Sequence, residues 1–223
     1  MDNLNNTTLN ITEIFYSLQG EAREVGIPTV FVRLTGCPLR CNYCDTAYAF
    51  KGNNPLSIKH ILDEVAQYKT QYVCVTGGEP MAQGNCLKLL DALVSSGYNV
   101  SMETSGSIDI TPVNSKVSIV MDIKTPSSTE EHQNRYENLP ILEKKDQLKF
   151  VIASRSDFDW CTDLLDLHNF CLHACRNLYG RRCHGHCPAA RALAAVGAAA
   201  KIELFHLFEI LNLFVSKSDL NRY

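Results

Sequence analysis

The chain alternates between short apolar runs and longer stretches in which apolar residues recur every three or four positions. The runs are rich in β-branched residues and predict strands, whereas the three-to-four spacing predicts helices. Strands are expected over residues 11–18, 28–35, 72–76, 98–102, 117–123 and 147–152. Helices are expected over residues 57–70 and 85–96, with another beginning at Ser156. This alternation predicts an α/β fold, a parallel sheet with covering helices.

Polar residues and glycines follow four of the expected strands directly. They occupy residues 36–46, 76–80, 103–106 and 122–126. The C-terminal ends of parallel strands meet at one edge, which is where α/β barrels carry their chemistry. The units are too few for eight full repeats, so we expect an incomplete parallel β/α barrel with a functional site at that edge.

The chain length and charge narrow the class of protein. A chain of 223 residues suits one good core rather than two comfortable domains. The composition, 45% hydrophobic and 20% charged, is ordinary for a globular protein. The formal net charge of −3 gives no electrostatic reason to expect direct nucleic-acid binding.

Ten cysteines are many for this length. Residues 1–10 begin with a polar stretch that lacks an apolar signal segment, and we expect them to be a disordered lead-in. A cytoplasmic location without a membrane anchor follows as an expectation. Thiols there stay reduced and are free to bind metal.

Cys37, Cys41 and Cys44 form a CxxxCxxC motif within the stretch 36–46. An iron–sulfur cube is normally held by four thiolates, so three without an obvious fourth predict a cube with one open iron. An open metal position is typical of a catalytic site. Structural zinc would need a second ligand pair nearby, and a thiol redox pair would need no third cysteine. Buried or zinc-bound cysteines remain the alternative.

This cysteine loop, with Tyr43 before its last cysteine, resembles that of the radical S-adenosylmethionine (SAM) enzymes. The resemblance implies a partial barrel of the radical SAM type, with SAM bound to the open iron. Gly77 and Gly78 come one βα unit later, in a GGEP sequence. Paired glycines let a backbone approach a ligand closely, and these resemble the segment that meets the SAM amino group.

A narrower resemblance covers residues 11–169. The sequences FYSLQGE, FVRLTGC, CDT, GEP, ETSG and LKFV together resemble the 7-carboxy-7-deazaguanine synthases of queuosine biosynthesis. The resemblance implies a lyase that converts 6-carboxy-5,6,7,8-tetrahydropterin to 7-carboxy-7-deazaguanine with loss of ammonia. A radical derived from SAM would take a hydrogen from the pterin, and SAM would be regenerated. Mg²⁺, an electron donor such as flavodoxin and a homodimer are also implied.

The same resemblance assigns residues to each ligand. The [4Fe–4S] cluster would be held by Cys37, Cys41 and Cys44, and the Mg²⁺ by Thr46. SAM would be bound by Tyr43, Gly78, Asp122, Ile123 and Lys124. The pterin would be bound by Leu18, Gln19, Gly20, Arg33 and Thr76.

Two of these residues, Arg33 and Thr46, and the unassigned Glu103 have simpler explanations. Arg33 is the one charge in its strand, and it is either a strand-end residue that reaches solvent or an anion clamp, since arginine suits carboxylates. Thr46 could cap the loop that follows the cysteines instead of holding Mg²⁺, whose preference is for hard oxygen ligands. Glu103 could accept hydrogen bonds in a turn, and its role stays open.

The resemblance ends near Cys171, so residues 11–170 are expected to form the barrel and 171–223 an atypical tail. Residues 171–202 contain no Asp or Glu, and cysteines and histidines cluster over 171–187. The tail could be diverged or frameshifted, a zinc-binding appendage, or a replacement helix over 202–215. A diverged tail would leave a homologue with impaired turnover.

Two other functions remain open from the sequence. Another radical SAM enzyme, such as a glycyl-radical activase, would share the cysteine loop but not SLQGE and CDT. A small iron–sulfur or zinc protein that carries electrons would need a fourth ligand at the cube. The GGEP and DIK segments would have no purpose in such a protein.

Overall fold

The computed structural model describes residues 4–167 and 211–216. The strands in chain order are β1 (Thr8–Leu18), β2 (Pro28–Leu34), β3 (Pro55–Ser57), β4 (Tyr72–Gly77), β5 (Asn99–Thr104), β6 (Ser118–Ile123), β7 (Gln147–Ile152) and β8 (Leu211–Ser216). The α-helices are α1 (Ile58–Val65), α2 (Cys86–Ser95) and α3 (Arg155–Leu167). Short 3-10 helices are η1 (Ala47–Phe50), η2 (Pro80–Ala82), η3 (Pro126–Ser128), η4 (Glu131–Gln133) and η5 (Tyr136–Ile141).

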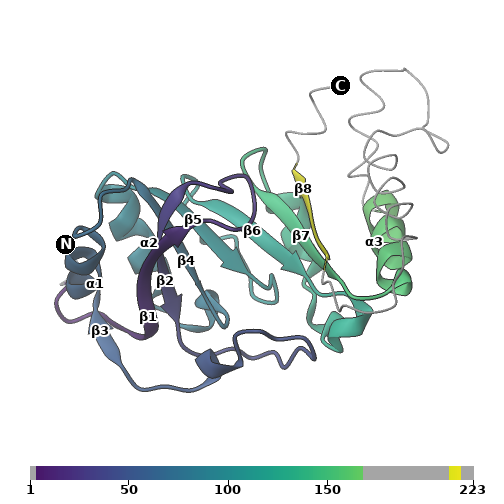
Figure 1. The fold of residues 1–223 in the computed structure, drawn as a ribbon, viewed down its shortest axis with the longest axis horizontal. Coiled ribbons are helices and arrows are strands. Elements are labelled where there is room, and N and C mark those ends of the chain that lie inside the picture. The colour runs from purple at the N-terminus through teal and green to yellow at the C-terminus, as the bar shows by residue number, and fades with distance from the viewer. Residues whose placement is uncertain (1–3, 168–210, 217–223) are drawn as a thin grey trace.

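The described strands form one sheet in the order β3-β1-β2-β4-β5-β6-β7-β8 (Figure 1). The strands from β2 to β7 in this order are parallel to one another. Strands β1, β3 and β8 are antiparallel to their neighbours at the two sides. The outer strands β3 and β8 do not pair with each other, so the sheet is open and the predicted partial barrel is confirmed.

Side chains alternate between the two faces of the sheet, as the strand geometry requires. One face carries apolar residues of every central strand and packs against all three α-helices in a single core. On β2, Val30, Val32 and Leu34 belong to this core, whereas Phe31 and Arg33 line a cavity on the other face. The cavity therefore lies on the face that the helices leave uncovered.

Two boundaries differ from the sequence prediction. The expected lead-in over residues 1–10 is wrong from Thr8 onwards, because Thr8–Asn10 pair with β3 and the Leu9 side chain is buried. The helix expected over 57–70 ends at Val65. The Thr70 hydroxyl instead donates to the Pro28 carbonyl at 2.6 Å and accepts from the Tyr72 amide, which directs the chain into β4.

The expected tail is only partly described. The Cys/His-rich stretch proposed for zinc lies outside the described residues, as does most of the helix proposed over 202–215. For residues 211–215 a helix is wrong, since they form β8 in antiparallel register with β7, from Leu211 opposite Ile152 to Ser216 opposite Gln147. Among the described residues, no helix has the length and apolar character that a membrane span requires.

The start of α1 provides a test of the local fold. The Ser57 side chain accepts a hydrogen bond from the His60 amide at 3.2 Å, as expected for an N-cap. We expect Ser57→Ala to lower the free energy of unfolding by about 1 kcal/mol in urea titrations of the apoprotein. The matched control is Ser95→Ala, an exposed position in α2, which should change it by less than about 0.5 kcal/mol. Equal effects would contradict the capping role.

Candidate functional site

A cavity of about 460 Å³ lies at the C-terminal ends of the parallel strands. Its wall is formed by the cysteine loop 36–46, the ends of β2, β4, β5, β6 and β7, and the loop after β1. The four polar segments predicted to meet at this edge therefore do so. Parallel strands place their following loops together, which is why the sequence pattern sufficed.

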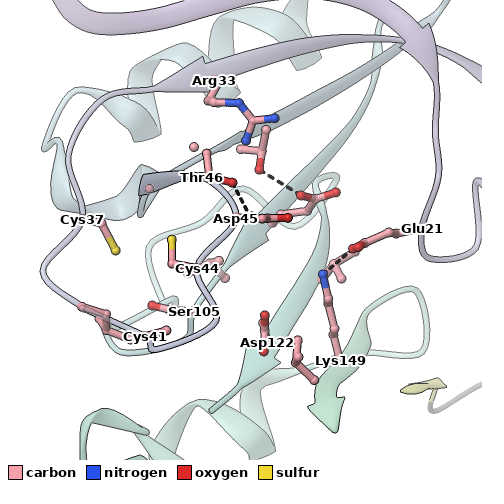
Figure 2. Close-up of a pocket in the computed structure, with 18 of the residues that line it drawn as sticks. Glu21, Arg33, Cys37, Cys41, Cys44, Asp45, Thr46, Ser105, Asp122 and Lys149 are labelled. Carbon is pink, nitrogen blue, oxygen red and sulfur yellow. Dashed lines mark hydrogen bonds and ion pairs between the residues drawn. The ribbon is translucent and has the colours of Figure 1, made fainter. Parts of the chain in front are cut away.

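The three motif cysteines line this cavity together. Figure 2 shows Cys37, Cys41 and Cys44 on one side of it, each only partly buried. Burial raises the pKa of the Cys37 and Cys41 thiols. The other described cysteines, at 74, 86 and 161, are buried and none lines the cavity. The part of the chain that the structure describes therefore offers the cavity three thiols and no fourth.

Arg40 holds the cysteine loop in shape. Its guanidinium donates to the carbonyls of Cys37 and Leu39 at 2.7 and 2.6 Å. The guanidinium also lies 4.3 Å from the centre of the Phe50 ring, within the range of a cation–π contact. Gly36 begins the loop with φ of 98°, a conformation that favours glycine.

The described residues contain no set of three His, Cys, Asp or Glu side chains that converges on a single metal ion. Zinc ligands would need to converge within about 2.3 Å of one atom. Thiolates at separate corners of an iron–sulfur cube bind different iron atoms and need no such convergence. Three separate thiols are compatible with a cluster, in which each would bind its own iron atom.

Gly78 packs against the cysteine loop. A Cβ atom at Gly78 would lie 2.2 Å from the Gly36 carbonyl oxygen and 2.7 Å from the Cys37 Cβ. The Glu79 amide donates to the same Gly36 carbonyl at 2.8 Å. The paired glycines were expected to admit a ligand, and the structure adds that Gly78 admits the cysteine loop itself.

Glu79 has no role among the sequence predictions, yet its side chain is fully buried. Its carboxylate accepts hydrogen bonds from the Ser105 amide and hydroxyl at 2.7 and 2.6 Å, and from the Thr104 hydroxyl at 2.8 Å. It also accepts from the Met81 amide at 3.0 Å. Glu79 thus ties the glycine loop after β4 to the loop after β5. No single motif signals these contacts, because Thr104 and Ser105 lie some 25 positions later in the chain.

Four of the five residues assigned to the pterin line the cavity: Gln19, Gly20, Arg33 and Thr76. The Leu18 side chain does not, since it is 61% exposed outside the cavity. The assignment of Leu18 to the pterin therefore stays a prediction, which its main chain would have to meet. Strand alternation explains the exposed side chain, because neighbouring residues in β1 point in opposite directions.

Glu103 lies at the centre of the pterin set. Its carboxylate accepts from the Thr76 hydroxyl at 2.9 Å, the Gln19 amide nitrogen at 3.3 Å and the Cys74 thiol at 3.4 Å. The alternative of a turn acceptor is wrong, because these partners come from β4 and from the loop after β1 and not from its own turn. Glu103 itself lines the cavity and orients two neighbours that do the same.

Four of the five residues assigned to SAM line the cavity: Tyr43, Gly78, Asp122 and Lys124. The Ile123 side chain is fully buried in the core on the opposite face, so only its main chain could serve a cofactor. The Asp122 carboxylate accepts from Lys124 through Oδ2 at 3.0 Å, and its buried Oδ1 has no partner among the described residues.

Charges in the cavity are largely paired. Burial lowers the pKa of Lys124, but the negative charge of Asp122 and the nearby Cys41 outweigh burial and raise it overall. Glu21 and Lys149 form an ion pair on the side of the cavity away from the cysteines (Figure 2). This pair joins the loop after β1 to β7, so it links the two sides of the open sheet.

Known proteins resemble both the sequence and the fold. Residues 31–125 match the model of the Radical SAM superfamily. The 7-carboxy-7-deazaguanine synthase of Koribacter versatilis is 43% identical over 162 residues, which cover 72% of each chain. That of Thermoplasma acidophilum is 40% identical and covers 70% of this chain and 76% of its own.

Two further matches agree with these. The 7-carboxy-7-deazaguanine synthase of Chlorobaculum tepidum is 37% identical, covering 77% of this chain and 79% of its own. The crystal structure of QueE from Escherichia coli has a TM-score of 0.65 at 21% identity, covering 89% of this chain and 92% of that one. At 21% identity, the likeness to QueE supports the fold alone. The family is shown by the relatives whose sequences are 37–43% identical to this chain. The chain therefore belongs to the 7-carboxy-7-deazaguanine synthase family of radical SAM enzymes.

Proposed function

We propose that this enzyme is a carbon–nitrogen lyase that converts 6-carboxy-5,6,7,8-tetrahydropterin to 7-carboxy-7-deazaguanine, with loss of ammonia. The observation that carries the proposal is that one cavity holds both the three motif thiols and the polar set around Glu103. Cofactor and substrate can therefore meet in one cavity.

The cysteines and the glycine loop fit a cluster with bound SAM. Cys37, Cys41 and Cys44 would hold a [4Fe–4S] cluster and leave one iron for SAM. When bound, the cluster and SAM supply the radical that abstracts a hydrogen from the substrate. The protein positions these groups and excludes water around them.

The chain offers SAM several polar contacts. The unpaired Oδ1 of Asp122 can accept a hydrogen bond from a hydroxyl or ammonium group. Lys124 keeps Asp122 in place through their ion pair, and Tyr43 borders the same part of the cavity. The Gly78 main chain lies against Cys37, close to where SAM would meet the cluster.

The polar set offers the pterin complementary groups. The ring edge of a pterin carries an amino group and a neighbouring N–H, and the Glu103 carboxylate can accept both. Gln19 and Thr76 already donate to Glu103 and orient it. Arg33 is suited to the substrate carboxylate, because a guanidinium binds carboxylates in a planar, two-point geometry.

Thr46 remains our candidate for Mg²⁺. Its hydroxyl donates to the Asp45 carboxylate at 2.6 Å, which leaves the lone pairs of the oxygen for a cation. A hydroxyl combined with substrate oxygens and water suits the octahedral preference of Mg²⁺. Homodimerisation and electron transfer from a donor such as flavodoxin also stay predictions.

Anaerobic reconstitution with iron and sulfide tests the proposal. The protein is incubated with SAM, reductant, Mg²⁺ and 6-carboxytetrahydropterin, and the products are analysed by mass spectrometry. We expect 7-carboxy-7-deazaguanine from the natural sequence and none from Cys44→Ala. Cys161→Ala is the control, because Cys161 lies in the core away from the cavity and all three motif thiols remain.

The other outcomes separate the parts of the proposal. SAM cleavage without the deazaguanine product would contradict the substrate assignment while leaving the radical chemistry intact. Failure to assemble any cluster would contradict the assignment of the three thiols. A turnover close to that of the bacterial and archaeal relatives would contradict the idea that the tail impairs catalysis.

A further inference from the structure

Glu13 lies directly opposite Arg33 in the β1–β2 pair because of an irregularity in β1. Ile11 is opposite Leu34 and Glu13 is opposite Arg33, so Thr12 is an extra residue in the ladder. In regular alternation Glu13 would share the core-facing side of Ile11. The extra residue moves Glu13 to the cavity face, as β-bulges near functional sites do.

Glu13 holds the Arg33 guanidinium by one edge. Glu13 Oε1 accepts from Arg33 Nε at 2.7 Å and from the Tyr48 hydroxyl at 2.8 Å. These two bonds outweigh the effect of burial, which alone would raise the pKa of Glu13, and lower it overall. Glu13 therefore stays charged at neutral pH and remains an acceptor.

Aromatic rings restrict the same guanidinium. Arg33 Cζ lies 5.7 Å from the centre of the Phe15 ring and 6.0 Å from that of the Tyr48 ring. Phe15 is itself stacked on Phe31, with ring centres 4.9 Å apart. Arg33 is only 16% exposed and lines the cavity. Among the described residues, none accepts a hydrogen bond from its two terminal amino groups.

We propose that Glu13 is a positioning residue that fixes Arg33 so that its two terminal amino groups bind the substrate carboxylate. With Nε engaged by Glu13, the remaining edge of the guanidinium is the one that fits a carboxylate in two-point geometry. Glu13 also balances the charge of Arg33 through their ion pair. This inference rests on the proposed pterin substrate and adds the residue that makes the site selective for its carboxylate.

The test compares two ligands that differ only in the carboxylate. Binding of 6-carboxypterin and of unsubstituted pterin to the reconstituted enzyme with SAM and Mg²⁺ is measured by equilibrium dialysis without turnover. We expect the natural sequence to prefer 6-carboxypterin and Glu13→Ala to reduce that preference by about tenfold, the usual effect of one lost bond to a charged group. Binding of unsubstituted pterin should change by less than about twofold.

Further variants separate positioning from folding. Glu13→Gln should keep most of the preference, because its amide oxygen can still accept from Arg33 and Tyr48. Arg33→Ala should abolish the preference for 6-carboxypterin. The double variant Glu13→Ala/Arg33→Ala should lose little more than Arg33→Ala alone, because the effects of two residues that act through one another are not additive. Asp63→Ala, which removes an exposed ion pair with Lys59 on α1, is the matched control and should leave the preference unchanged.

Two results would overturn the inference in different ways. If Glu13→Ala folds and keeps the full preference for 6-carboxypterin, Glu13 does not position Arg33 while the proposed function stands. If the natural sequence binds neither pterin, the proposed function fails and the inference fails with it.

Discussion

Alanine at Gly78 should reduce turnover by at least about 100-fold, the usual consequence of displacing reacting groups by an ångström. The added Cβ would lie 2.2 Å from the Gly36 carbonyl oxygen, whereas real Cβ atoms essentially never approach closer than 3.0 Å. The obstacle is backbone, which cannot rotate away as a flexible side chain could. The cysteine loop and the glycine loop must therefore separate, and Cys37 moves with them.

The experiment measures both the assembly of the cluster and the use of SAM by the Gly78→Ala variant. Iron and sulfide content after reconstitution, the dissociation constant of SAM and the rate of product formation are compared with those of the natural sequence. Gly84→Ala is the matched control, because nothing lies within 4 Å of a Cβ at Gly84. That control should bind SAM and turn over within about twofold of the natural sequence. Normal SAM binding and turnover in Gly78→Ala would show that the two loops need not touch.

Glu79→Ala should lower the free energy of unfolding by about 3 kcal/mol, because it leaves several buried donors without their acceptor. The Ser105 and Met81 amides cannot turn toward other partners, since their directions are fixed by the backbone. Water would have to enter the core or the loops would have to rearrange. We expect SAM binding to weaken as well, because Glu79 ties the glycine loop to the loop after β5.

Urea titration of the apoprotein measures this effect without interference from the cluster. Glu64→Ala is the control, since Glu64 makes only a long 3.9 Å contact with His60 on the exposed side of α1. It should change the free energy of unfolding by less than about 0.5 kcal/mol. A loss in Glu79→Ala as small as in this control would mean that the buried donors find other partners.

Much of the fold could be predicted from the hydrophobic pattern. Strands of the parallel sheet such as β7, expected and found at Gln147–Ile152, are short and largely apolar runs that alternate along the chain with helices, so the pattern leaves little choice. Helix ends were less certain, as at Thr70, where one hydroxyl bond to a distant carbonyl decides where the chain turns. Such bonds depend on tertiary structure and leave no periodic signal.

The site was predictable where a local motif carries the chemistry. The three cysteines and the polar ends of the strands meet as expected, because their spacing and topology suffice. Ile123 and Leu18 were assigned by resemblance alone, and the alternation of side chains places both away from the cavity. The comparisons with known proteins also decide against a glycyl-radical activase.

The roles of Glu13 and Glu79 could not be predicted. Glu13 reaches the cavity face only through the extra residue at Thr12, and a bulge has no sequence signature of its own here. The residue type alone would place Glu79 at the surface, because glutamates are rarely buried unless they have partners. Its partners lie some 25 positions later in the chain, so the spacing of residues within the GGEP motif does not reveal them.

The antiparallel strand β8 has a consequence for how molecules of this protein behave toward each other. It pairs with β7 along its whole length, from Gln147 to Ile152, and thereby uses the backbone groups of an otherwise open margin. At the opposite margin, β3 is only three residues long and begins with proline, so it presents few groups to another chain. A chain cut short before Leu211 would expose the whole of β7 as a template for intermolecular pairing. Strand β8 therefore shields β7 from intermolecular pairing and itself becomes the outermost described strand of this margin, a role that is independent of any part it has in catalysis.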